Sequence, residues 1–235
     1  MASRQQYGRE SSGDVRIRWS RALPIGTLVL LGVLLAVGLL TSEMSEATHR
    51  AWVQRLGFDL EAARSLRLWT LPLATLFEAD AGVGIGFLFI FAATGSAVWL
   101  LEAVAGARRM LLIFFLADWA ASILRLVTVG CLAALGSSEA SALLHVGDTG
   151  SSAAATGALA AAVVNLRGTR AKVGLVVLGA WLLIGALYFR LDVSIVHTWG
   201  AVAGVCLGRL MIRRREEPVE REPSEVSRLA SPPTA

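Results

Sequence analysis

Long apolar runs alternate with short polar stretches along most of the chain. A membrane-spanning helix needs about 20 mainly apolar residues to cross about 30 Å of hydrocarbon. On that criterion the pattern predicts six spans, at residues 23–40, 81–105, 110–135, 152–166, 173–189 and 193–212. The chain is therefore expected to be an all-α polytopic membrane protein, with a six-helix membrane domain over residues 22–213.

The segments outside these runs differ in character. Residues 1–21 carry five arginines and predict a polar arm, whereas residues 214–235 are rich in Pro, Glu and Ser and predict a disordered tail. Between about residues 41 and 80, charges are mixed with Trp and Leu, which is typical of helices at a membrane interface. Residues 136–149 contain no Lys or Arg and predict a second polar loop.

Composition supports a membrane protein. Hydrophobic residues make up 55% of the chain and the mean hydropathy is +0.61, whereas soluble domains are usually about 45–50% apolar. The net charge of +4 does not indicate a nucleic-acid partner, because the basic residues gather at the ends of apolar runs and do not interleave with aromatics. Cys131 and Cys206 lie inside apolar runs, so no disulfide is expected.

The distribution of basic residues predicts the topology. Six spans place both termini on one side of the membrane, and Lys and Arg follow the second, fourth and sixth runs. The positive-inside rule then predicts cytoplasmic termini, with the 41–80 and 136–149 loops outside. A bacterial inner membrane is the expected location. The lipid bilayer is the expected partner.

The third apolar run contains two charges, Asp118 and Arg125, seven residues apart. A charge in the middle of a span costs about 2.5–3.5 kcal/mol on insertion scales. Both side chains are therefore expected to face the interior of the bundle and to find polar neighbours there.

Two chemically capable side chains lie at matching depths. Ser152 precedes Arg167 by 15 residues, and His197 precedes Arg213 by 16. At 1.5 Å per residue, both are about 22–24 Å from the basic boundary. Both are thus predicted to lie below the outer edge of a hydrocarbon core about 30 Å thick.

Small residues predict that the helices carrying this pair pack closely. Gly200, Gly204 and Gly208 recur every four residues in the last span. In the fourth span, Ala153, Gly157 and Ala161 form a similar stripe. Such stripes let helix backbones approach closely in lipid.

A serine beside a histidine suggests hydrolytic chemistry. An imidazole within about 2.6–3.2 Å can take the proton of a serine hydroxyl and activate it as a nucleophile. A serine at a helix amino terminus also has free backbone N–H groups nearby, which suit a developing oxyanion. Taken alone, Ser152 could equally be a helix cap, whereas an ionisable residue such as His197 in a span suggests function. No metal or cofactor is expected.

These residues resemble the rhomboid family of intramembrane serine proteases. Gly150-Ser151-Ser152-Ala153, continuing to Gly157, is similar to the family's GxSG nucleophile segment. His197 with Gly200 and Gly204 is similar to its HxxGxxxG sixth helix. The resemblance covers residues 23–213. Two further segments support it more weakly. Glu102 to Arg109 is similar to an ExxxG motif followed by a basic turn, and Arg67 to Phe77 is similar to the stretch that leads into the family's second span.

The resemblance implies a fold, an activity and a substrate class. It implies a six-helix core in which Ser152 is the nucleophile and His197 is the general base. It also implies a site opened to external water and single-span membrane proteins as substrates.

The chain departs from the family pattern at the oxyanion site. Ala153 replaces the usual glycine, and the family's HxxxN pair on the second helix falls on Gly86 and Ile90. Each lost side-chain donor costs about 10²–10³ in rate. The expected substitutes are backbone N–H groups around Gly150, Ser152 and Ala153, or the side chains of His145 or Thr149. Asp148 is expected to cap the helix or tune His197.

Two alternatives follow from this departure and from the membrane character. The first is a catalytically inactive rhomboid-like protein that binds transmembrane helices. The second is a small transporter or channel, which is less well supported because inverted repeats and a path of buried charges are missing.

Overall fold

The computed structural model describes residues 23–78, 84–188 and 191–213, and every regular element within them is a helix. The predicted arm at 1–21 and tail at 214–235 lie outside these residues. The helices are α1 (Ile25–Ser42), α2 (Glu46–Leu56), α3 (Leu60–Arg64), α4 (Thr70–Leu76), α5 (Ile85–Ala105), α6 (Ala107–Ala134), α7 (Ser138–Leu143), α8 (Ser152–Val163), α9 (Gly168–Tyr188) and α10 (Leu191–Arg213).

Five helices, α1, α5, α6, α9 and α10, are long and apolar enough to cross a membrane. They correspond to five of the six predicted spans. The exception is the predicted fourth span, because α8 has only 12 residues and is about 18 Å long. The protein is therefore all-helical and suited to a bilayer, with a sixth apolar helix that is shorter than a span.

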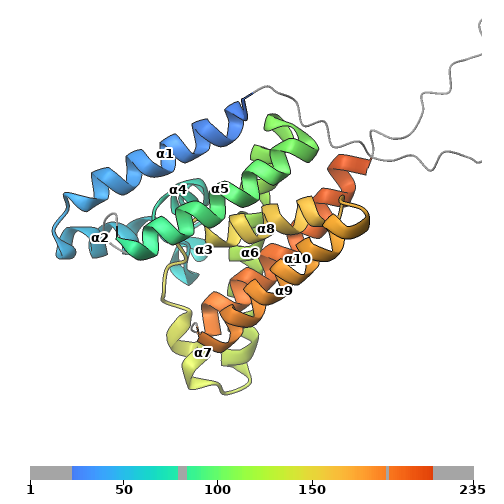
Figure 1. Ribbon diagram of the computed structural model, residues 1–235. Coiled ribbons are helices and arrows are strands. Elements are labelled where there is room, and N and C mark those ends of the chain that lie inside the picture. The colour runs from blue at the N-terminus through green and yellow to red at the C-terminus, as the bar shows by residue number, and fades with distance from the viewer. Residues whose placement is uncertain (1–22, 79–83, 189–190, 214–235) are drawn as a thin grey trace, which may run out of the picture.

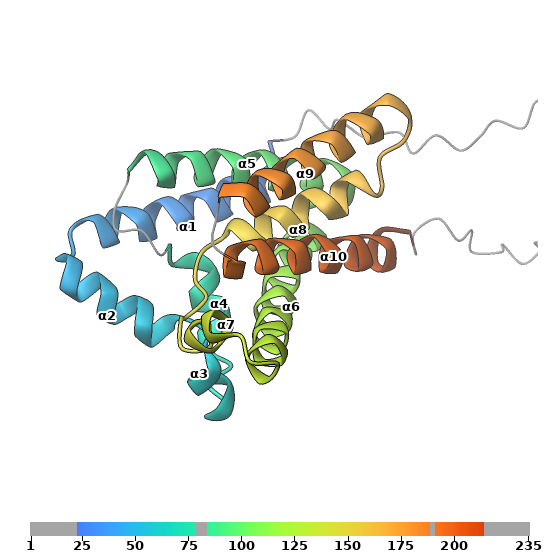
Figure 2. The same cartoon turned by 90° about the horizontal axis from the view of Figure 1, so that it is seen from below.

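The short helix α8 lies at the centre of the bundle, between α5, α6, α9 and α10 (Figures 1 and 2). Ten of its 12 residues are buried, which explains why its sequence is almost entirely small. The main apolar core forms where Ala154, Ala158 and Ala161 of α8 meet Val98 of α5 and Phe114 of α6.

Predicted helix ends differ from the observed ones by a few residues. The α9 helix begins at Gly168, whereas the prediction placed its start at residue 173. The prediction excluded Arg170 and Lys172 as charged. Both are exposed in the first turns of α9, where long basic side chains can reach water from a helix end. The α8 helix ends at Val163 rather than at 166. The predicted start of the second span, at 81, lies outside the described residues, and α5 begins at Ile85.

The segment after α1 forms three short helices, where an interfacial loop was predicted. Ser45 caps α2 by accepting a hydrogen bond from the Thr48 N–H, and Asp59 caps α3 by accepting one from Ala62. These caps satisfy backbone donors at the helix starts. The α4 helix packs against α6, so this segment is attached to the bundle.

Glu102, near the end of α5, fastens the start of α1. Its carboxylate accepts hydrogen bonds from the N–H groups of Gly26 (3.0 Å) and Thr27 (2.7 Å) and from the Thr27 hydroxyl (2.6 Å). These N–H groups are in the first helical turn, where the helix provides no acceptor. Glu102 therefore acts as a cap contributed by a neighbouring helix.

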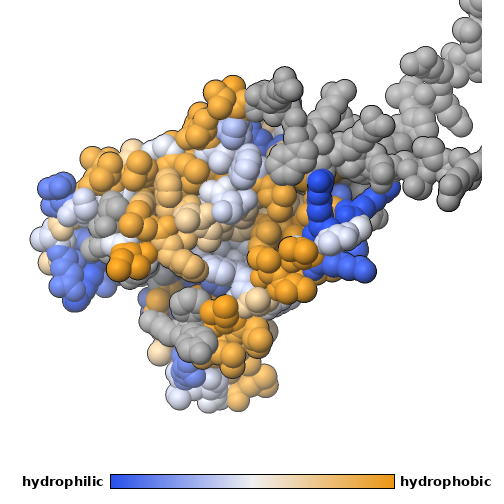
Figure 3. Space-filling view, viewed as in Figure 1, coloured by the Kyte–Doolittle hydropathy of each residue, from blue (hydrophilic) through white to orange (hydrophobic). Residues whose placement is uncertain are grey.

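The bundle has two distinct ends. The start of α1, the α5–α6 turn, the α8–α9 turn and the end of α10 gather at one end (Figures 1 and 2). The α7 helix lies away from that end (Figure 1). The space-filling view shows a mainly apolar surface, with hydrophilic residues gathered at the α8–α9 turn and, on the opposite side, over α2 (Figure 3).

Candidate functional site

The structure brings Ser152 and His197 together. Ser152 Oγ lies 3.0 Å from His197 Nε2. Ser152 is the first residue of α8 and is half-buried, whereas His197 lies in the second turn of α10 and is only 3% exposed. The two side chains, 45 residues apart in sequence, are within hydrogen-bonding distance.

Small residues make this approach possible. A Cβ on Gly200 would lie 2.6 Å from the carbonyl oxygen of Ala153, and one on Gly208 would lie 2.9 Å from Ala161 Cα. At Gly204 a Cβ would overlap the carbonyl oxygen of Gly157. The backbones of α8 and α10 are therefore in direct contact along this line.

An indole ring adjoins both members of the Ser152–His197 pair. The ring of Trp181, from α9, lies 5.8 Å from the His197 ring, centroid to centroid. Its N–H donates to the Thr156 hydroxyl at 2.9 Å, and this hydroxyl donates to the Ser152 carbonyl at 2.8 Å. Trp181 thus lies beside the imidazole and is linked through the Thr156 hydroxyl to the backbone of Ser152.

The residues just before Ser152 are held by a carboxylate. Glu78 accepts hydrogen bonds from the Ser151 N–H (2.9 Å) and the Ser151 hydroxyl (2.7 Å). Gly150 has φ +111°, and a Cβ there would lie 2.8 Å from Glu78 Oε2. The positive φ favours glycine here, whereas the Glu78 carboxylate, at the end of a flexible side chain, could move aside for a Cβ.

The amino terminus of α8 offers backbone donors. The first N–H groups of a helix have no intrahelical acceptor, and the N-cap residue, Ser151, makes no side-chain cap. Glu78 takes the Ser151 N–H, and the Asp118 carboxylate lies beside the backbone of Ala154. The N–H groups of Ser152 and Ala153 are consequently the donors best placed for an anion at the hydroxyl.

Asp118 and Arg125 face the interior, with exposed fractions of 4% and 2%. Asp118 accepts a hydrogen bond from the Thr75 hydroxyl at 2.6 Å. Arg125 pairs with Asp192 of α10 at 3.5 Å and donates to the Val146 carbonyl at 3.3 Å. Each predicted charge therefore has polar neighbours, contributed by other segments.

Asp148 does not cap α8, so that prediction was wrong. Its carboxylate accepts a hydrogen bond from Ser122 of α6 at 2.6 Å, and its backbone forms an isolated bridge with Phe58. Burial raises the pKa of Asp148, and the Asp192 carboxylate adds to this increase, whereas Arg125 and the Ser122 hydrogen bond oppose it. Asp148 fastens the loop before α8 to the neighbouring helix.

Other sequence predictions fall outside the pair. His145 is exposed at the end of α7, and no hydrogen bond links it to Ser152 or His197 in the part of the chain that the structure describes. Gly86 and Ile90 lie on α5 and bring no polar side chain. Within the described ranges, no group of three His, Cys, Asp or Glu side chains could hold a metal ion.

Four residues around the site were not predicted from the sequence: Trp181, Thr156, Glu78 and Thr94. The Thr94 hydroxyl lies 3.4 Å from the Ser151 hydroxyl. The only available indication was their polarity within otherwise apolar segments. That polarity does not reveal which side chains meet.

The chain matches no protein-family model, no curated protein and no solved structure in comparisons with known proteins. The geometry of the site is therefore the basis for a functional conclusion.

Proposed function

We propose that the protein is an intramembrane serine protease of the rhomboid type, with Ser152 as nucleophile and His197 as general base. One observation carries this proposal, the 3.0 Å separation of Ser152 Oγ and His197 Nε2 among membrane-compatible helices. A hydroxyl and an imidazole at this distance have the geometry that nucleophilic catalysis needs.

The proposed reaction is peptide hydrolysis in two steps. Nε2 of His197 accepts the Ser152 proton as Oγ attacks the peptide carbonyl, and the oxyanion is stabilised by the N–H groups of Ser152 and Ala153. His197 then donates the proton to the leaving amine, and an acyl-enzyme remains. Water, deprotonated by His197, attacks the ester and releases the second product and free Ser152.

The site's position favours a membrane substrate. Ser152 follows a loop in which Gly150 and Ser151 are buried, and irregular backbone at membrane depth is tolerated where protein covers it. We take this loop and α8 together as the fourth of six crossings, with the basic turns in the cytoplasm of a bacterial cell. Substrates are then single-span proteins cleaved near the external face.

One observation favours an alternative function, a catalytically inactive protein of the same type that binds transmembrane helices. Glu78 occupies the Ser151 N–H, which would otherwise be a third backbone donor. Gly86 and Ile90 offer no side-chain donor either. Only two backbone donors then remain, and each missing donor costs about 10²–10³ in rate.

The deciding experiment measures both covalent labelling and cleavage. The purified full chain in liposomes is treated with a fluorophosphonate and, separately, with a library of single-span substrates. The parent protein should label at Ser152 and cleave, whereas Ser152→Ala and His197→Ala should each lose about 10⁴-fold or more in cleavage rate.

Ser141→Ala is the matched control, because this serine is exposed on α7 and bonds only to the Ser137 carbonyl within its own turn. It should behave like the parent. Cleavage that survives both Ser152→Ala and His197→Ala would overturn the dyad. Binding of single-span helices without labelling or cleavage would establish the inactive alternative.

A further inference from the structure

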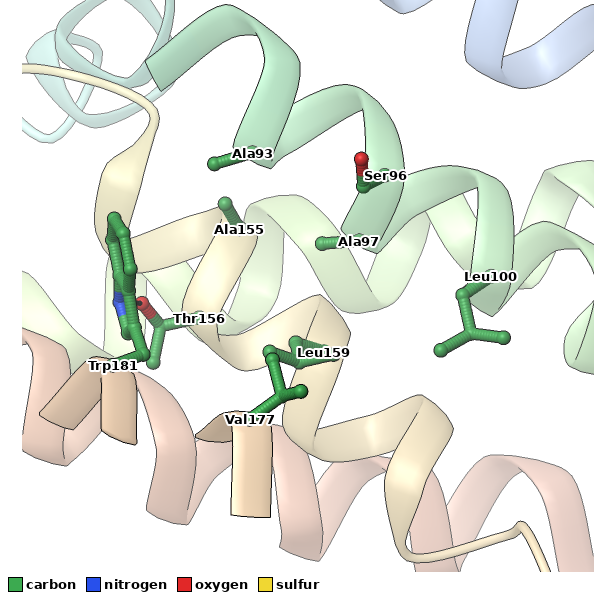
Figure 4. A pocket seen from close by; sticks show the side chains of 9 residues that line it. All are labelled: Ala93, Ser96, Ala97, Leu100, Ala155, Thr156, Leu159, Val177 and Trp181. Carbon is green, nitrogen blue, oxygen red and sulfur yellow. Dashed lines mark hydrogen bonds between the residues drawn. The ribbon is translucent and has the colours of Figure 1, made fainter. Parts of the chain in front are cut away.

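A continuous groove runs along the outside of α8, between α5 and α9. Two adjoining cavities form it, of about 240 Å³ and 340 Å³. They share the lining residues Leu100, Leu159 and Val177, one from each helix. Figure 4 shows the first cavity, in which small side chains of α5 face α8 and α9 across an open space.

The groove has the length of one bilayer leaflet. Its α9 wall extends from Arg170 to Trp181, a separation of 11 residues, which corresponds to about 16 Å of helix. Half of a hydrocarbon core about 30 Å thick is about 15 Å. The lining is almost entirely apolar between these two residues, with Ser96 and Thr156 as the polar side chains.

The two ends of the groove differ in charge. At the α8–α9 turn it is lined by Thr169 and Arg170. Lys172 is exposed on the same turn of α9. Hydrophilic residues gather at the α8–α9 turn on the surface (Figure 3). The described lining residues include no acidic side chain, so this end is suited to an anion.

The inner end is bordered by one aromatic ring that lines the first cavity, Trp181 of α9. Phe89 of α5 and Trp181 of α9 stack with centroids 5.9 Å apart. An α-helix with its side chains is about 10 Å across, which is too wide for a cavity of only about 240 Å³. A single hydrocarbon chain, by contrast, fits the narrow space.

We propose that this groove holds one anionic phospholipid from the leaflet at the α8–α9 turn. Its phosphate binds at Thr169 and Arg170, and one acyl chain runs along Leu159 and ends against Trp181. The site is separate from the Ser152–His197 pair and does not depend on catalysis. Because Trp181 also contacts His197, the acyl chain supports the indole ring that adjoins the pair.

Retention of lipid by the purified protein tests this proposal. The full chain is stripped of lipid in detergent and titrated with phosphatidylglycerol or with phosphatidylcholine of identical acyl chains, and native mass spectrometry counts the bound lipids. One phosphatidylglycerol should bind more tightly than phosphatidylcholine. Arg170→Ala should lower the affinity for phosphatidylglycerol about fivefold, which is the effect of one basic side chain on an anionic lipid. Arg108→Ala, an exposed arginine at the α5–α6 turn, is the matched control and should retain the parent affinity.

A second pair of variants tests the acyl-chain path. Val177→Trp should abolish the retained lipid by filling the groove, whereas Val176→Trp should not. Both valines are exposed on α9, with fractions of 51% and 71%, so both variants should fold, but only Val177 lines the groove. Equal binding of the two lipids, or equal retention in the members of either variant pair, would overturn the proposal, as would crosslinking of a peptide helix instead of lipid from position 177.

Discussion

The Trp181 indole makes two contacts, and replacing it with phenylalanine would remove one of them and keep the other. It lies beside the His197 ring and donates a hydrogen bond to Thr156. An aromatic pair contributes about 0.5–1.5 kcal/mol beyond its buried area, and a buried neutral hydrogen bond contributes a similar amount. At this scale the site depends on side chains from three helices.

For the proposed protease, Trp181→Phe should lower kcat about 2- to 10-fold, because it keeps the ring and loses the N–H. Trp181→Ala should lower kcat further, since both contacts are lost, with a smaller change in KM. The rate of fluorophosphonate labelling provides a readout that needs no substrate. Thr156→Val removes this acceptor together with the hydrogen bond from the Thr156 hydroxyl to the Ser152 carbonyl. Because both variants lose the same indole hydrogen bond, the double variant should lose less than the sum of the two single effects. Additive effects would show that the hydrogen bond does not position the imidazole.

Asp148 provides a test based on pH. Its pKa is raised by burial first and by Asp192 second, so the folded protein favours the protonated carboxyl more than the unfolded chain does. The stability due to this group is then present at low pH and is lost as pH rises through the raised pKa.

Asp148→Asn should therefore stabilise the protein at neutral and alkaline pH, and the advantage over the parent should disappear as the pH is lowered toward the pKa of an ordinary carboxyl. Thermal unfolding of both proteins across this range measures the difference. Asp59→Asn is a suitable control, because Asp59 caps α3 outside this cluster. An advantage independent of pH would contradict the assignment.

At the scale of helices, the contact between α8 and α10 decides whether the site exists. Gly200, Gly204 and Gly208 have no room for a side chain, and the spacing of four residues was visible in the sequence. The sequence also predicted equal depths for Ser152 and His197, because both apolar runs end at arginines. These two regularities explain why the pair could be anticipated.

Other features could not be anticipated from periodicity. The α9 helix is apolar on all sides, so its sequence does not indicate that Trp181, rather than Trp199, approaches His197. The length of α8 was overestimated because the apolar composition continues to Leu166, beyond the last helical residue, Val163. The hydrogen bond from the Ser151 N–H to the Glu78 carboxylate joins residues 73 positions apart, and no local sequence pattern reveals such a contact.

Gly204→Ala should destabilise the protein by about 1–3 kcal/mol, the usual cost of overpacking. For a chain of this size, that corresponds to about 2–4 °C in Tm per kcal/mol. Labelling at Ser152 should fall as well, because the added methyl group moves α10 away from α8. Gly32→Ala is the control, since a Cβ at this position of α1 meets nothing within 4 Å. A Tm equal to that of this control would show that the two helices separate without cost.

At the scale of the whole molecule, α8 determines the topology. Five helices are long enough to cross a membrane, and α8, at about 18 Å, is not. The loop before it has buried backbone at Gly150 and Ser151 and extends the path of the chain toward α7. If this loop and α8 together form a crossing, α7 and the α8–α9 turn lie on opposite sides of the membrane.

Two single-cysteine variants test this arrangement. Glu139→Cys on α7 and Lys172→Cys on α9 are both exposed positions, and they are introduced after Cys131 and Cys206 are replaced by serine. In intact cells, a membrane-impermeant maleimide should label Glu139→Cys. Lys172→Cys should label only after permeabilisation, because the proposed topology places the basic turn in the cytoplasm. Labelling of both from one side would mean that α8 does not complete a crossing. The fourth crossing proposed for this loop and α8 would then be wrong, and the six-crossing topology with it.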